Sequence, residues 1–429
     1  MDYQVVTAVG IFLVTYALIV SEKVHRTIVA LLGGVLMVVT GILTQENAVH
    51  HIDFNTIGLL LGMMIIVGVT SETGLFSYLA IWAAKKVGGD PVKLLVALVF
   101  LTAVCSAFLD NVTTVLLTVP VTISICHKLQ VKTMPYLISQ ILASNIGGTA
   151  TLIGDPPNIM IGSAVKELSF MAFIQNLSFI SLLILLATVG LLVLIYRSQL
   201  HTTEELKQEL MQMDAAQELK DHTLLKKCLG ILALTILLFF LHQILHLESA
   251  TVALFGASLL LLLAKKEVEH QLEHIFHKVE WVALFFFVGL FIIVGALVET
   301  GVISYLAKEA MALTQGNLTA TSLVILWMSA IASAFVDNIP FVATMIPMIK
   351  EMGVMGISNL EPLWWSLALG ACLGGNGTLI GASANIIVAG LSAQEGQPIS
   401  FIEYLKVGFP LMILSIIMSH IYIYLRYLM

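Results

Sequence analysis

Two short polar clusters interrupt long apolar stretches of this chain, and their side chains are of the kind that binds ions. The clusters lie within residues 92–128 and 319–350. Carboxylates inside apolar segments are costly and usually functional, although Asp and Asn also serve simply as helix N-caps. The candidate ion-binding residues in these clusters are Ser106, Asp110, Asn111 and Thr114 in the first, and Ser333, Asp337 and Asn338 in the second.

Two glycine-rich segments, 147–158 (GGTATLIGDPPN) and 374–385 (GGNGTLIGASAN), cannot continue an ordinary helix. Each predicts a helix broken into two halves. Half-helix ends direct positive dipole ends and freed carbonyl groups toward one site, which can hold a cation and an anion side by side. The candidate ligands here are Thr151, Gly154, Asp155 and Asn158, together with Asn376, Thr378, Gly381, Ser383 and Asn385.

Asp155 is the main difference between the two segments, because Ala382 stands at its place in the other. We expect burial to raise the pKa of Asp155, which would make it a candidate proton carrier. The alternative is a helix cap that stays ionised. No Lys or Arg lies near these motifs in the sequence, which favours a cation or proton over a bare anion. A possible Na⁺ site would consist of Asp110, Asn111, Asp337 and Asn338.

The composition says what must position these residues. The 429-residue chain is 59% hydrophobic and 11% charged, with a mean hydropathy of +0.98. A soluble protein carries about 25% charged residues, so this chain cannot cover a soluble surface. Its apolar runs are too long for an outer-membrane barrel. The sequence therefore predicts an all-α polytopic membrane protein and excludes a cytosolic enzyme, a disulfide-rich secreted domain and a disordered chain.

The hydropathy pattern predicts ten full spans and two re-entrant hairpins. The hairpins are 92–128 and 319–350, each too long for one crossing and polar in its middle. The amphipathic segments 71–87 and 299–313 are expected at the membrane interface. The predicted spans lie near 4–20, 27–44, 54–70, 134–164, 172–197, 226–246, 249–264, 280–298, 361–391 and 403–428.

The positive charges predict the orientation. With the N-terminus outside, sixteen Lys and Arg residues fall on the cytoplasmic side and four fall outside. Cytoplasmic loops are normally enriched in Lys and Arg. We therefore expect a multi-pass protein of the inner (plasma) membrane with both termini outside.

The chain contains a duplication at an offset of 227 residues. Twelve of 19 residues are identical between 62–80 and 289–307, and SAFLDN at 106–111 matches SAFVDN at 333–338. Five spans in each half place the second copy upside down, as in secondary transporters. The predicted organisation is a first inverted repeat at 1–197, a cytoplasmic linker at 198–225 and a second repeat at 226–429. The broken helices are 134–164 and 361–391.

Several long motifs resemble a known family. They include SAFLDNVTTVLLTVPVTI (106–123), NIGGTATLIGDPPNIMIGS (145–163) and SAFVDNIPFVATMIPM (333–348). They are similar to the P protein family and the arsenite permease and sodium–proton antiporter branch of the ion transporter superfamily. The resemblance implies an elevator-type transporter whose scaffold forms a homodimer. Related dicarboxylate transporters carry Ser-Asn-Thr at the hairpin tips, where this chain has Asp-Asn.

The expected function is secondary active transport that couples Na⁺ or H⁺ movement to a small inorganic ion or a small carboxylate. The alternatives are an arsenite, antimonite or carboxylate permease of the same fold, or a passive anion channel. No HExxH or GxSxG motif supports an enzyme, and no cofactor or nucleic-acid partner is expected. The chain lacks a phosphate-binding GxxxxGK[ST] loop, so an ATPase subunit is not indicated.

Overall fold

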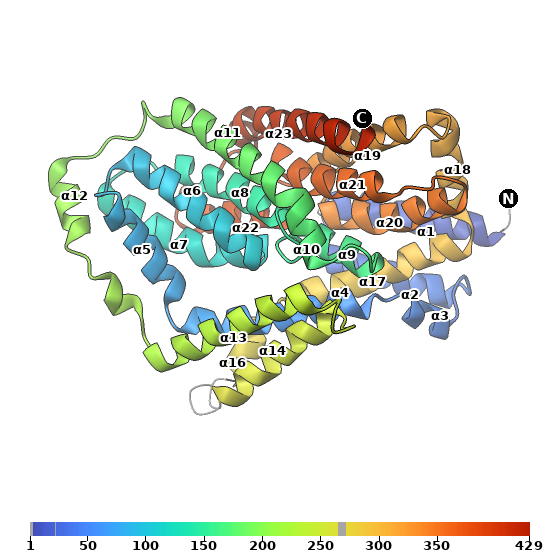
Figure 1. The fold of residues 1–429 in the computed structure, drawn as a ribbon, viewed down its shortest axis with the longest axis horizontal. Helices are drawn as coiled ribbons and strands as arrows, with labels where there is room; N and C mark the ends of the chain where they lie inside the picture. The colour runs from blue at the N-terminus through green and yellow to red at the C-terminus, as the bar shows by residue number, and fades with distance from the viewer. Residues whose placement is uncertain (1–2, 22, 265–271) are drawn as a thin grey trace.

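The protein is helical throughout the part of the chain that the computed structural model describes, which is residues 3–21, 23–264 and 272–429. Figure 1 shows a long bundle with the N-terminus at one end and helix α12 (Glu204–Met211) at the other. Helix α12 belongs to the segment predicted as the linker between the repeats. Two of the positive charges in the orientation count, Lys265 and Lys266, lie outside the described residues.

Nine helical segments in the described residues are long and apolar enough to cross a membrane. Helices α2 (Arg26–Val39) and α14 (Ser249–Leu263), predicted as full spans, have only 14 and 15 residues. They reach about 21–23 Å at 1.5 Å per residue, which is less than a bilayer core. The nine are α1 (Tyr3–Ser21), α4 (Phe54–Glu72), α6 (Pro91–Phe108), α7 (Asn111–Leu129), α10–α11 (Phe170–Tyr196), α13 (His222–Leu241), α17 (Trp281–Glu299), α19 (Leu318–Phe335) and α23 (Phe401–Ile423) with the π-helical turn that continues it to Leu428.

Each predicted hairpin is a pair of helices with a break at the acidic residue. Helices α6 and α7 are joined by Leu109 and Asp110, and α19 is joined to α20 (Asn338–Val354) by Val336 and Asp337. With 17 to 19 residues each, these helices are longer than the half-helices expected from the sequence. A tight helix pair still returns the chain to its starting side, so the order of the other spans is unaffected.

Both predicted broken helices are interrupted at the glycine-rich segments. Helix α8 (Met134–Thr149) ends before an irregular stretch that leads into α9 (Pro156–Ala164). Helix α21 (Glu361–Gly374) is followed by a turn of 3₁₀-helix and then α22 (Ser383–Gln394). The remaining short helices are α3 (Gln45–His50), α5 (Leu75–Lys86), α16 (Leu272–His277) and α18 (Val302–Thr314).

The two halves exchange equivalent contacts, as a two-fold repeat requires. Helix α4 packs on α14 and α17 packs on α2, while α7 contacts α22 and α20 contacts α9. Each half also pairs its own helices, α6 with α8 and α19 with α21. At the crossings, a Cβ on Gly62 would lie 2.5 Å from the backbone of Ala253, and one on Gly289 would lie 2.4 Å from that of Ala30. Glycine therefore allows the same close helix approach in both copies.

A contact between a glutamate and a basic side chain is also repeated at the same offset. Glu72 pairs with Lys278, and Glu299 lies 3.2 Å from the His51 ring. Each pair joins the C-terminal end of α4 or α17 to a residue of the other half. These contacts explain the duplicated glutamates better than a purely local role at helix ends.

The outer surface carries large apolar side chains on several helices. Val14 on α1 is 61% exposed, Leu194 on α11 is 60% exposed and Leu262 on α14 is 69% exposed. Water is a poor solvent for such a surface, so these faces need the hydrocarbon of a bilayer.

Candidate functional site

The two hairpin tips and the two broken helices meet around a small enclosed cavity of about 30 Å³. This volume is enough for an ordered water molecule, which needs roughly 10–15 Å³ on this measure. Five of the sequence-predicted site residues line the cavity, and two that the sequence did not indicate, Arg26 and Glu280, join them. The five predicted residues are Asp110, Asn111, Asp155, Asn338 and Ser383.

Asp155 is fully buried and lacks a full set of hydrogen-bond partners. Its Oδ1 accepts a bond of 3.4 Å from the Asn338 amide, and its Oδ2 has no nitrogen or oxygen partner within the described residues, although the Cys372 thiol lies beside the carboxyl group. Asp155 stands at the N-cap position of α9 without making a capping bond from its side chain. The cap interpretation therefore does not account for this carboxyl group. An unpaired carboxyl oxygen at a polar cavity can be satisfied by a proton or by a cation.

Asp110 is satisfied within its own hairpin. It caps α7 by accepting a 2.8 Å bond from the backbone N–H of Thr113, and the Thr113 hydroxyl donates to its other oxygen. Only 8% of the residue is exposed. Asp110 therefore acts as a helix N-cap, as the sequence allowed for both acidic tips, and it also lies on the cavity wall.

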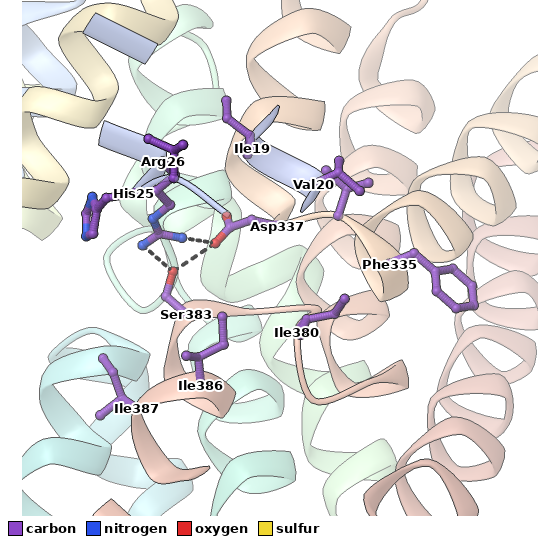
Figure 2. Close-up of a pocket in the computed structure, with 12 residues that line it drawn as sticks. Ile19, Val20, His25, Arg26, Phe335, Asp337, Ile380, Ser383, Ile386 and Ile387 are labelled. Carbon is purple, nitrogen blue, oxygen red and sulfur yellow. Dashed lines mark hydrogen bonds and ion pairs between the residues drawn. The ribbon is translucent and has the colours of Figure 1, made fainter. Parts of the chain in front are cut away.

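Asp337, the equivalent residue of the second hairpin, has a different partner. Figure 2 shows the Arg26 guanidinium contacting both Asp337 and Ser383, whose hydroxyl donates to Asp337 Oδ2 over 2.9 Å. The Phe286 ring supports the guanidinium, 5.1 Å from its centre. No Lys or Arg is near Asp337 in the sequence, but the fold brings one to it. Arg26 is 311 residues away in the sequence, and the packing of α2 on α17 brings it here.

Glu280 is a second charged residue that local motifs did not reveal. It precedes α17 and lines the inner cavity with Asp110 and Asp155. Within the described ranges, no three His, Cys, Asp or Glu side chains form a metal-binding group. The suggested Na⁺ site at the hairpin tips stays a prediction, and in this conformation its Asp337 is paired with Arg26.

Most of the other predicted residues hold the broken segments together. The Asn158 and Asn385 amides donate to backbone carbonyls freed by the helix breaks, at 2.9 Å to those of Thr151 and Thr378 respectively. A Cβ on Gly154 or Gly381 would lie within 2.8 Å of backbone oxygens. The hydroxyls of Ser106, Thr151, Ser333 and Thr378 donate to carbonyls of neighbouring helices, whereas the buried Thr114 hydroxyl has no partner in the described part of the chain.

Asn145 lies at the centre of a buried amide network that the sequence analysis missed. Its Nδ2 donates to Asn376 Oδ1 at 2.9 Å and to Asn385 Oδ1 at 3.0 Å, and its Oδ1 accepts from Asn111. The network joins the two halves of the protein. The offset of 227 pairs Asn145 with Cys372, whose thiol contacts the Asn158 amide oxygen at 3.5 Å. A comparison of buried positions between the repeats would have revealed Asn145 as a polar residue paired with a cysteine.

Replacing Asn145 with alanine is expected to lower stability by about 1–3 kcal/mol, since it leaves buried amide groups unpaired. Thermal unfolding in detergent measures the effect. Asn47→Ala on the exposed face of α3 is the matched control and should behave like the wild type. An equally small change in both variants would show that the network does not hold the halves together.

Apolar outer faces, nine helices of spanning length within the described residues and charged groups gathered around an internal cavity define a polytopic membrane transporter, not an enzyme. The chain belongs to the citrate transporter (CitMHS) family, whose model matches residues 16–370.

Proteins that are similar over nearly the whole of this chain support this assignment. An uncharacterized transporter of Mycobacterium bovis is 43% identical over 428 residues, covering 98% of both chains. A 46 kDa membrane protein of Mycobacterium leprae is 41% identical over 99% of both chains. The human P protein is 35% identical over 96% of this chain, which spans 59% of that protein.

A solved structure shows the same fold. The YdaH transporter of Alcanivorax borkumensis superposes with a TM-score of 0.57 over 88% of this chain and 86% of its own, at 14% sequence identity. The predicted all-helical polytopic fold and the predicted family resemblance are thus confirmed.

Proposed function

We propose that this protein is a secondary transporter that couples proton movement to a small ion or carboxylate, with Asp155 as the group that carries the proton. The observation that supports this most directly is the unpartnered oxygen of Asp155, which is fully buried beside a water-sized cavity. Proton transfer needs one such carboxyl group.

We further propose an elevator mechanism in the plasma membrane, with both termini outside. In Figure 1, α2, α4, α13, α14 and α17 gather along one side, and the hairpins and broken helices form the other. The first group would be the dimer scaffold, and the second would carry the hairpin tips and Asp155 across the membrane. The orientation rests on the distribution of Lys and Arg.

Purified protein in liposomes with a trapped pH-sensitive dye tests the proposal. Trial cargoes are Na⁺, arsenite, citrate and butyrate. We expect one cargo to produce saturable flux that changes the internal pH, and a pH gradient to drive that cargo uphill. Cargo flux driven by a Na⁺ gradient with no internal pH change would overturn proton coupling and favour sodium.

An anion permease of the same fold is the second candidate, because Arg26 places a positive charge beside the site. The family model is described as a citrate transporter, which is consistent with an anionic cargo. In the same liposomes, anion flux that is insensitive to pH and Na⁺ would support this candidate. Flux that also fails to saturate would indicate a passive channel.

A further inference from the structure

The two repeats differ in the residues that surround their acidic tips. Around Asp110 the first repeat has Thr113 and Pro156, whereas the equivalent positions around Asp337 are Pro340 and Ser383. Arg26 is also unique to one side. Ala30 contacts Gly289, and Ala253 makes the equivalent contact with Gly62 in the other repeat, so Ala30 and Ala253 occupy equivalent positions. Arg26 lies four residues before Ala30, and the residue four before Ala253 is Ser249.

These differences change what each carboxylate can bind. Thr113 supplies an N–H and a hydroxyl to Asp110, but Pro340 has neither group to offer Asp337. Asp337 caps only the N–H of Ile339 with one oxygen, at 3.1 Å. Its other oxygen lies between the Arg26 guanidinium and the Ser383 hydroxyl. The second tip thus contains a receptor for a carboxylate, and the protein's own side chain occupies it.

The receptor also borders an open pocket of about 270 Å³ at the protein surface, where lining side chains such as Val24 and Phe335 are partly exposed. Figure 2 shows Arg26, Asp337 and Ser383 on its wall, with isoleucine and valine side chains around them. Apart from this polar group and His25, the lining residues are apolar: Ile19, Val20, Val24, Phe335, Val336, Ile380, Ile386 and Ile387. One guanidinium in an otherwise apolar pocket matches one carboxylate on a short hydrocarbon chain.

We propose that Arg26 and Ser383 bind the carboxylate of a short-chain monocarboxylate, which displaces Asp337 from the guanidinium. A tricarboxylate would leave two charged groups against isoleucine and valine. The displaced Asp337 carboxylate, 8% exposed, then needs a new partner. A coupling ion would supply that partner for Asp337. The inference rests on the proposed function and deepens it, because it identifies the cargo as a short-chain monocarboxylate.

Direct binding to purified protein in detergent tests the site without any gradient, so it does not depend on proton coupling. Butyrate is the probe, with citrate and chloride as competitors, and calorimetry is the measurement. We expect saturable butyrate binding that Arg26→Gln weakens by about tenfold or more, since charge-assisted hydrogen bonds are lost. Arg26→Lys, which keeps the charge, should weaken it less. Arg197→Gln, an exposed arginine at the end of α11, is the matched control.

Asp337→Asn separates competition from a structural role. If Asp337 competes with the ligand, this variant binds butyrate more tightly than the wild type, whereas a merely structural ion pair predicts weaker binding. Asp221→Asn, which alters the N-cap of α13, is its control. Three results would overturn the proposal: weaker binding in Asp337→Asn, butyrate binding that is insensitive to Arg26→Gln, or binding of citrate or chloride without butyrate.

Discussion

Asp155→Asn is expected to abolish proton-coupled transport while leaving the fold intact. Asparagine has the same shape and can still accept the bond from Asn338, but it cannot release or take up a proton. A coupling free energy of about 1–3 kcal/mol between two sites corresponds to a roughly 5–150-fold change in affinity. We therefore expect the initial rate of pH-driven uptake to fall by about tenfold or more and to become independent of pH.

The measurement uses liposomes with whichever cargo gives wild-type flux, over a series of external pH values. Asp90→Asn is the matched control, because Asp90 caps α6 through a 2.9 Å bond from the N–H of Lys93, far from the cavity. An Asp155→Asn variant with the rate and pH profile of the wild type would exclude a proton-carrying role for this residue.

Gly147→Ala is expected to give a large loss of stability. Gly147 lies where α8 crosses α6, and a Cβ there would lie 2.2 Å from the carbonyl oxygen of Ala103. The obstacle is backbone, so the helices themselves must separate. We expect a loss of about 3 kcal/mol or more, at or above the upper end of ordinary overpacking. Chemical unfolding in detergent measures it.

Gly190→Ala provides a control of opposite sign. Gly190 lies within α11 with open space where its Cβ would stand, so alanine should stabilise that helix by up to about 1 kcal/mol. Equal stability of Gly147→Ala and the wild type would mean that the α6–α8 crossing is looser than the structure shows.

Much of the fold could be predicted because the sequence motifs that mark helix ends and helix breaks occur in both repeats. Asp110 and Asp337 interrupt apolar runs at equivalent positions, and both are N-caps of the second helix of a pair. The glycine-rich segments break their helices where the absence of side chains allows close backbone contacts. These features depend on residues adjacent in the chain, which is why the sequence reveals them.

The charge balance of the site could not be predicted, because it depends on distant contacts. Arg26 begins a helix that looks like an ordinary span, and only the packing of α2 on α17 brings its guanidinium to Asp337. Glu280 likewise looks like a helix-end residue. The span predicted at 27–44 was too long because hydropathy continues past Val39, where α2 ends, whereas α14 matches its predicted bounds and is simply short.

The amides of Asn158 and Asn385 determine how this protein can change shape. Each ties a broken segment to itself, and the hydroxyls of Thr151 and Thr378 tie the same segments to the hairpins. A loop held by so many hydrogen bonds is rigid and does not act as a hinge. Hairpin and broken helix therefore resist separate motion, which is consistent with the rigid-body movement proposed above rather than with the opening of a flap. Resistance to that movement would come from the surfaces between helices, where lipid and membrane tension can alter the rate.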